Sequence, residues 1–308
     1  MIVAAVLAGL CVGLFGPVPA VLARAGWVVR APRAAVALWQ AIGVAGSLSA
    51  VGAGLAVAVA PLHAGLVEGL HRLGDRALAG HPLAGLGLNE ALGLTIATDV
   101  GLVLAGGLVV TLVRTVRHRA RHREVLDLVC RRSDRVPGAV LLDHPDAVAY
   151  CLPGLRPRIV LSAGAVGALD QAELGAVVAH ERGHVQARHH LVMLPLSSMV
   201  DLLHWMPYAR LAPGAVAVLL EMAADDFATR THGRRTVAAA LVALASAGHG
   251  RVPRCAFAAA GTGVERRVHR LLAPTGHRRP TGVAALAAAA GVLALPLATV
   301  MASALLSR

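Results

Sequence analysis

The sequence predicts a mainly α-helical membrane protein, with four transmembrane helices and a polar, mostly helical α+β domain that carries a small β-sheet. Hydrophobic residues make up 56% of the 308 residues and charged residues only 15%, whereas soluble domains carry about 25% charged residues. Four apolar runs reach the roughly 20 residues that a bilayer-spanning helix needs. A long segment rich in Arg and His separates the third run from the fourth and predicts the polar domain.

The first three runs cover about residues 2–23, 34–62 and 91–113, and the fourth lies within 281–308. No positive charge precedes the first run, whereas a secretory signal peptide carries such charge before its apolar core. We therefore expect a retained first span, with cleavage near VPAVLARA as the minor alternative. Asp99 interrupts the third run. Because charge inside a bilayer is costly, this residue is either functional or paired with a Ser, Thr or Gln on a neighbouring span.

Arginine clusters beside the apolar runs predict the orientation of the chain, because Lys and Arg concentrate on the cytoplasmic side of a membrane. The clusters are Arg24, Arg30 and Arg33 after the first run, RTVRHRARHR at 114–123, and Arg278 and Arg279 before the last run. A multi-pass protein of the cell membrane with both termini outside and residues 114–280 in the cytoplasm satisfies all three. We attribute the net charge of +12 to this topology and to contact with anionic lipids of the bilayer. No nucleic acid is expected, because no zinc-finger spacing or RNA-binding aromatic cluster is present.

The four cysteines, Cys11, Cys130, Cys151 and Cys255, form no CxxC pair. Cys11 lies in the first apolar run, and the other three fall in the segment assigned to the cytoplasm, where thiols stay reduced. We therefore expect free thiols and no structural disulfide.

Residues 114–280 have the length of a single domain. Two β-like runs, AVLLD at 139–143 and RIVLS at 158–162, are separated by prolines and a glycine and predict a small hairpin or a pair of strands. Two helices are expected further along the chain, at about 216–232 and 236–247.

Another helix is predicted at about residues 171–189, between the strands and those two helices. Asp170 is a suitable N-cap, and Glu173 completes a capping-box pattern. The stretch 191–207 that follows is apolar but short. It predicts either a buried core helix or a segment that dips into the membrane surface.

His180 and His184, in the stretch AHERGHVQARHH at 179–190, bracket Glu181 in the pattern H-E-x-x-H. Residues four apart lie on one face of a helix, so both imidazoles can bind one zinc ion. Glu181 lies about 100° around the helix from His180, beside the metal, where it can take a proton from zinc-bound water. On an ideal helix the two histidines that close the stretch point away from this site, and we expect them at the surface or at the helix end.

A catalytic zinc ion binds three protein ligands, and the third candidate lies in LLEMAADDFA at 219–228. Glu221 and Asp225 are four apart on a predicted helix and face the same way. Glu221 can bind zinc, and Asp225 can accept a hydrogen bond from the non-ligating nitrogen of a zinc-bound histidine. Asp226 competes for that second role, although the spacing favours Asp225. A solvated acidic face is the alternative interpretation of these carboxylates.

Three features together resemble the membrane-embedded gluzincin metallopeptidases: HERGH at 180–184, ExxxD at 221–225 and the continuous block 156–184. The arrangement of three spans before the domain and one after it is also similar. The chain resembles most peptidase family M56, the β-lactam-sensing receptor type. That family is related to peptidase family M48, the CAAX prenyl protease and HtpX-like group. Those receptors carry a penicillin-binding domain after the last span, whereas this sequence ends at Arg308, so β-lactam sensing is not expected.

The resemblance implies a gluzincin-type zinc peptidase domain that binds one Zn²⁺ per chain through His180, His184 and Glu221. It implies Glu181 as the catalytic base and Asp225 as the hydrogen-bond acceptor behind a zinc-bound histidine. It also implies that an edge strand, around residues 158–162, pairs with an extended substrate.

VERRVHRLL at 264–272 is similar to an arginine-containing segment late in the M48 domains, although the HPP that precedes it there is absent. The position that matches best is Arg267. It either contacts the substrate or the zinc-site helix, or is a plain solvated arginine.

The function that we expect is a membrane-embedded zinc endopeptidase that hydrolyses peptide bonds of a protein or peptide substrate. One alternative is a signal-transducing membrane receptor whose proteolytic domain cleaves a regulator. Another is a non-catalytic membrane scaffold, against which the intact Glu181 argues, because a scaffold has no use for a catalytic base. The sequence predicts neither the substrate nor the oligomeric state.

Overall fold

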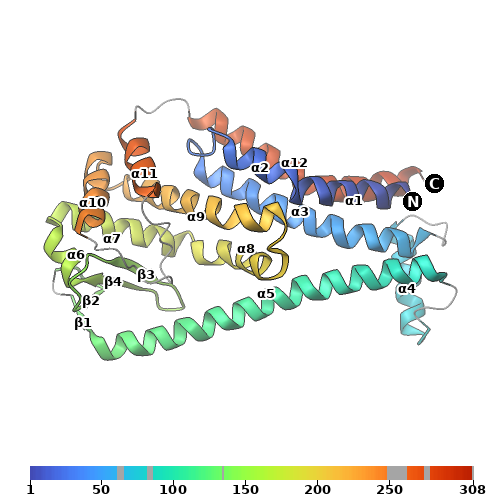
Figure 1. Cartoon of the computed structure of the whole chain (residues 1–308), viewed down its shortest axis with the longest axis horizontal. Helices are drawn as coiled ribbons and strands as arrows, with labels where there is room; N and C mark the ends of the chain where they lie inside the picture. Colours follow the sequence, from blue (N-terminus) through green and yellow to red (C-terminus); the bar gives the residue numbers. More distant parts are fainter. Residues whose placement is uncertain (61–65, 82–85, 134, 248–261, 274–277, 307–308) are drawn as a thin grey trace.

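The computed structural model describes residues 1–60, 66–81, 86–133, 135–247, 262–273 and 278–306. The molecule is elongated, with long helices at one end and a four-stranded sheet with shorter helices at the other (Figure 1). This mainly helical architecture with a small sheet confirms the fold class predicted from the sequence. Cys255, for which a free thiol is predicted, lies outside the described residues.

In the part of the chain that the structure describes, four helical segments are long and apolar enough to cross a membrane. α1 and α2 together form the first, and α3, α5 and α12 contain the others; their bounds are Ile2–Phe15, Pro17–Arg24, Pro32–Ala58, Leu88–Val129 and Arg278–Leu306. The start of α1 and the end of α12 lie at the same end of the molecule (Figure 1), as an even number of spans requires. These segments indicate a multi-pass membrane protein.

α3 lies at the centre of the helix bundle and packs against α1, α5 and α12. It approaches α5 closely at Gly54 and Gly93, because a side chain on Gly93 would lie 2.8 Å from the Gly54 carbonyl oxygen. Small residues permit such an approach between membrane helices. Most of the apolar part of α5 is exposed, and there Asp99 has no partner among the described residues. The predicted pairing of Asp99 with a neighbouring span is therefore not observed.

α5 continues without a break past residue 113, where the sequence predicts the end of the third span. The apolar span and the start of the polar segment therefore share one rigid helix. At the opposite end of α5, the short helix α4 (Leu66–Leu78) buries Leu66 and Leu73 in a small apolar cluster with Val59. This cluster closes the end of the bundle that lies far from the sheet (Figure 1).

The sheet has four short strands in the order β1-β2-β4-β3. Their bounds are Cys130–Arg132 for β1, Ala139–Leu142 for β2, Ala149–Leu152 for β3 and Arg158–Ser162 for β4. The two predicted β-like runs form β2 and β4, which pair in parallel with Val140 opposite Val160. They are paired strands, as one prediction has it, but not a hairpin, because the antiparallel hairpin partner of β4 is β3.

β4 is an interior strand, with β2 on one side and β3 on the other. The prediction that residues 158–162 form an edge strand able to pair with a substrate is therefore wrong, because both edges of β4 are occupied. β1 and β3 are the outer strands of the sheet, and of these β3, the neighbour of β4, contacts α7 (Gln171–Gln186). The sequence does not predict β3, because its four residues AYCL are too few to show an alternating pattern.

The remaining helices are α6 (Ala163–Ala168), α8 (His189–Leu203), α9 (Pro207–Ala228), α10 (Arg234–Ala247) and α11 (Thr262–Leu272). α7 begins with the predicted capping box: the Asp170 side chain accepts from the Glu173 N–H, and the Glu173 side chain accepts from the Asp170 N–H. α7 ends at Gln186, three residues before the predicted end. The reason is Arg188, whose left-handed backbone (φ 50°) turns the chain into α8.

α8 and α9 share one hydrophobic core with α1, α2 and α3. The Tyr208 hydroxyl of α9 donates to the backbone oxygen of Trp39 at 3.0 Å, and the Gln40 amide donates to the backbone oxygen of Val192 at 2.8 Å. The apolar stretch 191–207 therefore forms most of α8 and the turn to α9, and α8 packs against the bundle. It follows that the polar half of the molecule is built directly onto the membrane helices.

Candidate metal centre and active site

Two neighbouring helices, α7 and α9, bring three predicted site residues together in the polar half of the molecule. The Nε2 atoms of His180 and His184, one turn apart on α7, lie 3.1 Å from each other. Glu221 on α9 faces both, with Oε2 at 3.3 Å from His180 Nε2 and Oε1 at 3.3 Å from His184 Nε2. The three residues are largely buried, and their ligand atoms lie within 4.8 Å of one another, so they can hold a metal ion.

The separations within this cluster fit zinc. Zinc binds imidazole nitrogen and carboxylate oxygen at about 2.0–2.2 Å in a tetrahedron, so neighbouring ligand atoms are about 3.3 Å apart. The observed separations of 3.1 and 3.3 Å agree with that value. Two histidines and one glutamate also match the three-ligand sets of catalytic zinc sites, which leave a fourth position open.

Asp225 and Arg267 support the cluster from the α9 and α11 side. Asp225 is fully buried, and its Oδ1 lies 3.0 Å from Nδ1 of His180. Arg267 donates two hydrogen bonds to the Asp225 carboxylate, at 2.7 and 2.9 Å, and its third nitrogen lies 3.1 Å from Glu221. The interpretation of Arg267 as a plain solvated arginine is therefore wrong, because the side chain is buried and fully paired.

These contacts set the charge of the cluster. Burial alone would raise the pKa of Asp225, but its bonds to Arg267 and His180 outweigh burial and lower that pKa to about 2. Burial alone would lower the pKa of His180, but the carboxylates of Asp225 and Glu221 raise it to about 10. The two histidines in turn hold the pKa of Glu221 well below its ordinary value. Without a metal the cluster therefore holds a proton on His180, and a bound cation takes the place of that proton.

His189, one of the two histidines expected at the surface or at the helix end, lies at the start of α8 but is buried beside the cluster. Its Nδ1 lies 2.9 Å from Nδ1 of His184. The prediction fails because it extends α7 through residue 189 as an ideal helix, whereas the turn at Arg188 folds His189 back towards α7. Burial and the neighbouring His184 lower the pKa of His189 to about 3. A neutral His189 can therefore accept a hydrogen bond from His184 Nδ1–H, which leaves His184 Nε2 free to bind a metal.

Glu181 lies on the sheet side of the cluster, where it meets the edge strand. The Cys151 thiol of β3 is hydrogen-bonded to the Glu181 carboxylate. Burial and this carboxylate raise the pKa of the thiol far above its ordinary value, so Cys151 is a protonated donor and not a nucleophile. Strand β3 therefore borders the site directly.

A family model described as peptidase family M48 matches residues 116–273, which is more than half of the chain. The chain belongs to peptidase family M48. Neither the curated proteins nor the solved structures compared with the chain gave a match.

Membership of family M48 makes this protein a metallopeptidase, which is a hydrolase. The match begins within α5 and ends just after α11, so it includes the sheet and the three clustered residues. It shows the M48 part of the resemblance, while the closer kinship with family M56 remains a prediction.

Arg270 is a buried residue of this M48 domain that the sequence analysis does not single out. Its guanidinium donates to Asp226 at 2.6 Å and to the backbone oxygen of Val29 at 2.6 Å. Asp226 therefore pairs with Arg270, while Asp225 faces His180. Arg270 could have been predicted from the sequence, because it follows Arg267 by three residues and lies on the same face of α11. For His189 and Cys151 no comparable signal exists, since their positions depend on a turn and a strand that the sequence does not reveal.

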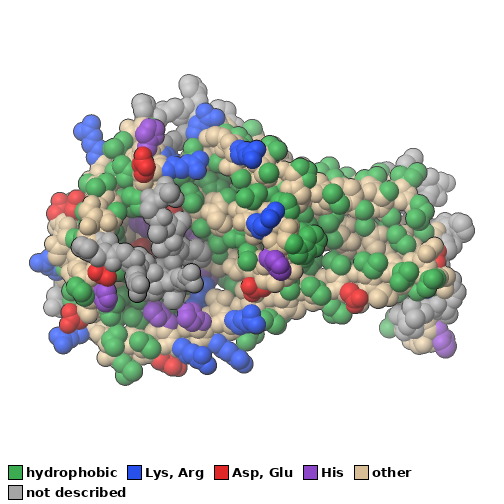
Figure 2. Space-filling view, viewed as in Figure 1, with side chains coloured by type: hydrophobic (Ala, Val, Ile, Leu, Met, Phe, Trp, Pro, Cys, Tyr) green, Lys and Arg blue, Asp and Glu red, His purple; other side chains and the backbone are tan. Residues whose placement is uncertain are grey.

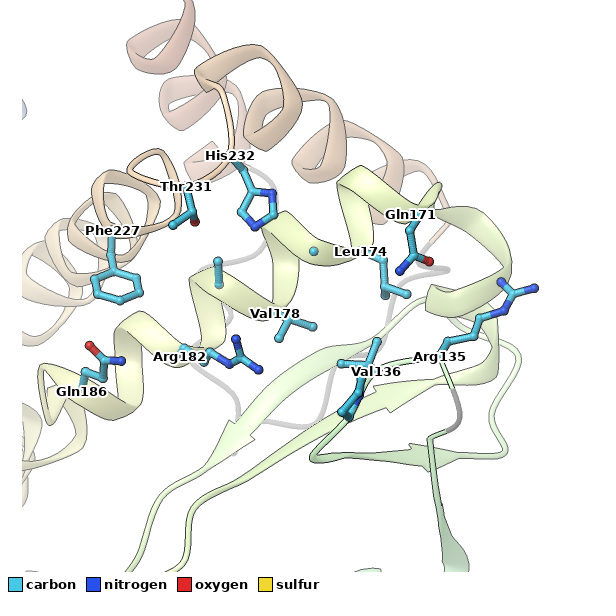
Figure 3. Close-up of a pocket in the computed structure, with 13 residues that line it drawn as sticks. Arg135, Val136, Gln171, Leu174, Val178, Arg182, Gln186, Phe227, Thr231 and His232 are labelled. Atoms are coloured by element: carbon cyan, nitrogen blue, oxygen red, sulfur yellow. The ribbon is translucent and has the colours of Figure 1, made fainter.

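A cavity of about 440 Å³ lies on the other side of α7 from His180. Figure 3 shows Val178 and Arg182 of α7 on one side of it and Phe227 and His232 on another. No residue of the metal cluster lines this cavity. We therefore do not assign it to the chemistry of the M48 domain.

Proposed function

We propose that the M48 domain is a zinc-dependent endopeptidase that hydrolyses peptide bonds of a protein substrate, with one zinc ion per chain held by His180, His184 and Glu221. The observation that carries the proposal is the convergence of these three side chains at separations that suit zinc. When bound, zinc supplies a Lewis acid that polarises the scissile carbonyl and acidifies water.

Glu181 is the proposed general base. It follows the first ligand directly on α7 and is buried beside the cluster. Its carboxylate accepts a proton from the attacking water and delivers it to the departing amine. The Cys151 thiol donates to this carboxylate and thereby restrains its orientation.

Three residues are proposed to position the ligands. The Asp225 carboxylate lies 3.0 Å from Nδ1 of His180, and Arg267 fixes that carboxylate with two hydrogen bonds. His189 accepts from Nδ1 of His184. Such partners fix the tautomer and the ring orientation of a metal-binding histidine.

Strand β3 is the proposed recognition edge for the substrate. One side of β3 is paired with β4, and its other side pairs with no further strand among the described residues. Cys151 of β3 meets Glu181, so this edge runs past the site. An extended substrate that adds to this edge by backbone hydrogen bonds would bring a peptide bond to the cluster.

We further propose that residues 114–280 form the peptidase domain and that it lies in the cytoplasm, with both termini outside. The arginine clusters that flank the spans support this orientation. Three spans before the domain and one after it also support kinship with the M56 receptor peptidases.

The test of the proposed function is a comparison of the purified protein with Glu181→Gln in detergent. We expect one zinc ion per chain in both proteins by mass spectrometry of the metal. Cleavage of an unfolded protein should fall by at least about 100-fold in the variant, as expected for loss of a general base. Arg182→Gln, at the exposed next position on α7, is the matched control and should retain cleavage. A parent without zinc, or a Glu181→Gln protein that cleaves at the parental rate, would contradict the proposal.

A further inference from the structure

The turn between α8 and α9 exposes a large aromatic side chain at the tip of a helical hairpin. Trp205 is 64% exposed, whereas Trp39 in the neighbouring α3 is only 1% exposed. Val200 on α8 and Leu211 on α9 are also exposed close to the turn. The neighbours His204 and Arg210 are exposed as well. The tip therefore combines an aromatic ring and aliphatic side chains with polar groups.

Contacts with α5 show which part of that helix lies beside the α8–α9 turn. Leu202 packs so tightly on Gly107 that a side chain at residue 107 would collide with it. One residue earlier, Asp201 lies 3.8 Å from Arg114. Gly107 belongs to the apolar part of α5 and Arg114 begins its basic part, about 10 Å apart at 1.5 Å per residue. The tip thus lies where α5 passes from apolar to basic.

The surface of the molecule changes character at the same level. Figure 2 shows charged and histidine side chains gathered over the half that carries the sheet, and hydrophobic side chains with few charged ones over the opposite half. The α8–α9 turn lies between these two halves (Figure 1). A bilayer that covers the hydrophobic surface would therefore end at the turn.

We propose that the α8–α9 turn lies in the headgroup boundary of the bilayer, with Trp205 as its anchor, and that α8 and α9 thereby hold the metal cluster at a fixed height above the membrane. Tryptophan concentrates at membrane–water interfaces, because its ring is apolar and its N–H bonds to water and headgroups. Arg210 can extend its charged end to the headgroups. Lipid suits this surface, because the turn continues the exposed apolar surface of α5.

The lengths of α8 and α9 give the same distance between the α8–α9 turn and the metal cluster. α8 runs for 15 residues from His189, which touches His184, to Leu203 at the turn. α9 runs from Pro207 at the turn to Glu221 in the cluster. Each distance is roughly 20 Å at 1.5 Å per residue. The cluster thus lies outside the bilayer, about 20 Å from its boundary along α8 and α9.

The distance of the metal cluster from the bilayer limits which substrates can reach it, an inference that rests on the proposed peptidase function. A polypeptide tethered to the same bilayer reaches the cluster only with enough extended chain outside the membrane. At about 3.4 Å per residue, a height of roughly 20 Å corresponds to about six residues. The preferred substrates are therefore membrane-anchored proteins whose scissile bond lies at least about six residues from the boundary.

Quenching of tryptophan fluorescence by brominated lipids tests the anchor without any cleavage assay. The protein is reconstituted in vesicles with bromine at shallow or deep acyl positions, and Trp205→Phe is subtracted from the parent to isolate the emission of Trp205. We expect blue-shifted emission that shallow bromines quench more than deep ones and that aqueous iodide scarcely quenches. Leu155→Trp in the Trp205→Phe protein is the matched control, because residue 155 is fully exposed at the β3–β4 turn. Its emission should respond to iodide alone, and the same response from Trp205 would overturn the proposal.

A series of tethered substrates tests the height. A sequence that the protein cleaves as a free peptide is fused to a single-span anchor through spacers of two, six or ten residues and reconstituted with the protein. We expect cleavage with the two longer spacers and at least a 10-fold loss with the shortest. Equal cleavage at all three lengths would overturn the fixed height, whereas failure to cleave the free peptide would instead contradict the proposed function.

Discussion

The two histidines of the cluster are supported in different ways. Behind His180 lies a charged network, in which a buried carboxylate is locked by a buried guanidinium. Behind His184 lies a single neutral imidazole, that of His189, brought there by a turn in the chain. The first support ties α7 to α9 and α11, whereas the second ties the end of α7 only to the start of α8. The comparison suggests that one ligand is held by charge across the domain and the other by local backbone geometry.

Removal of the guanidinium is expected to have the largest effect, because it leaves buried charge unpaired. Arg267→Leu should lower the free energy of unfolding by about 3–5 kcal/mol, since the buried carboxylates of Asp225 and Glu221 then share only the protonated His180 as their cation. Denaturation of the zinc-free protein in mixed micelles measures the change. Arg266→Leu, at the exposed preceding position, is the control and should change stability by less than about 0.5 kcal/mol. Equal effects of the two substitutions would show that the charged network around Arg267 does not stabilise the domain.

Neutralising the carboxylate behind His180 tests that network with less disruption. Asp225→Asn keeps the size of the side chain but weakens the acceptor for His180 Nδ1. We expect zinc affinity to fall about 10–100-fold, as measured by competition with a chromophoric chelator. Asp226→Asn, which weakens the pair with Arg270, should leave zinc affinity within about 3-fold of the parent. If Asp226→Asn had the greater effect, the assignment of the two aspartates would be reversed.

The neutral support behind His184 should contribute less. His189→Leu removes the acceptor, and we expect a loss of zinc affinity near the lower end of the usual range, about 10-fold. His189→Gln retains an acceptor and should recover most of this loss. His190→Leu is the matched control at the next position of α8 and should have no effect on zinc. A failure of glutamine to restore affinity would show that His189 acts by packing and not as an acceptor.

The smallest effect is expected at the turn that places His189. Arg188 has a positive φ of 50°, a conformation that costs a non-glycine residue about 1–2 kcal/mol and is worst for β-branched side chains. Arg188→Gly should therefore leave zinc affinity and stability almost unchanged, whereas Arg188→Val should lower stability by about 1–2 kcal/mol. Mixed-micelle denaturation of both variants provides the measurement. A valine variant as stable as the glycine variant would argue against a strained turn.

The same comparison explains what the sequence could predict. His180, Glu181 and His184 follow from helical periodicity within one segment, and Glu221 and Asp225 follow from the same rule within another. The capping box at Asp170 set the start of α7 correctly because it is a local signal. In contrast, nothing in the residues before His189 marks a left-handed turn, since Arg188 is neither Gly nor Asn.

The order of the strands in the sheet could not be predicted from the sequence either. Two runs with strong β-propensity could be recognised as paired, but the four residues of β3 insert between them in sequence and take the edge of the sheet. Which strand lies at an edge depends on pairing between distant segments, which a local pattern does not report. The sequence therefore identified the ligand candidates but misplaced the strand that borders them.

X-ray absorption at the zinc edge on the purified protein tests the central claim most directly. We expect one zinc ion per chain with only nitrogen and oxygen neighbours at about 2.0–2.2 Å, two of them imidazoles. His184→Ala should reduce the imidazole contribution to one. Substoichiometric zinc, or a sulfur neighbour at about 2.3 Å that would indicate a ligand such as Cys151, would contradict the assignment of His180, His184 and Glu221 as the metal site.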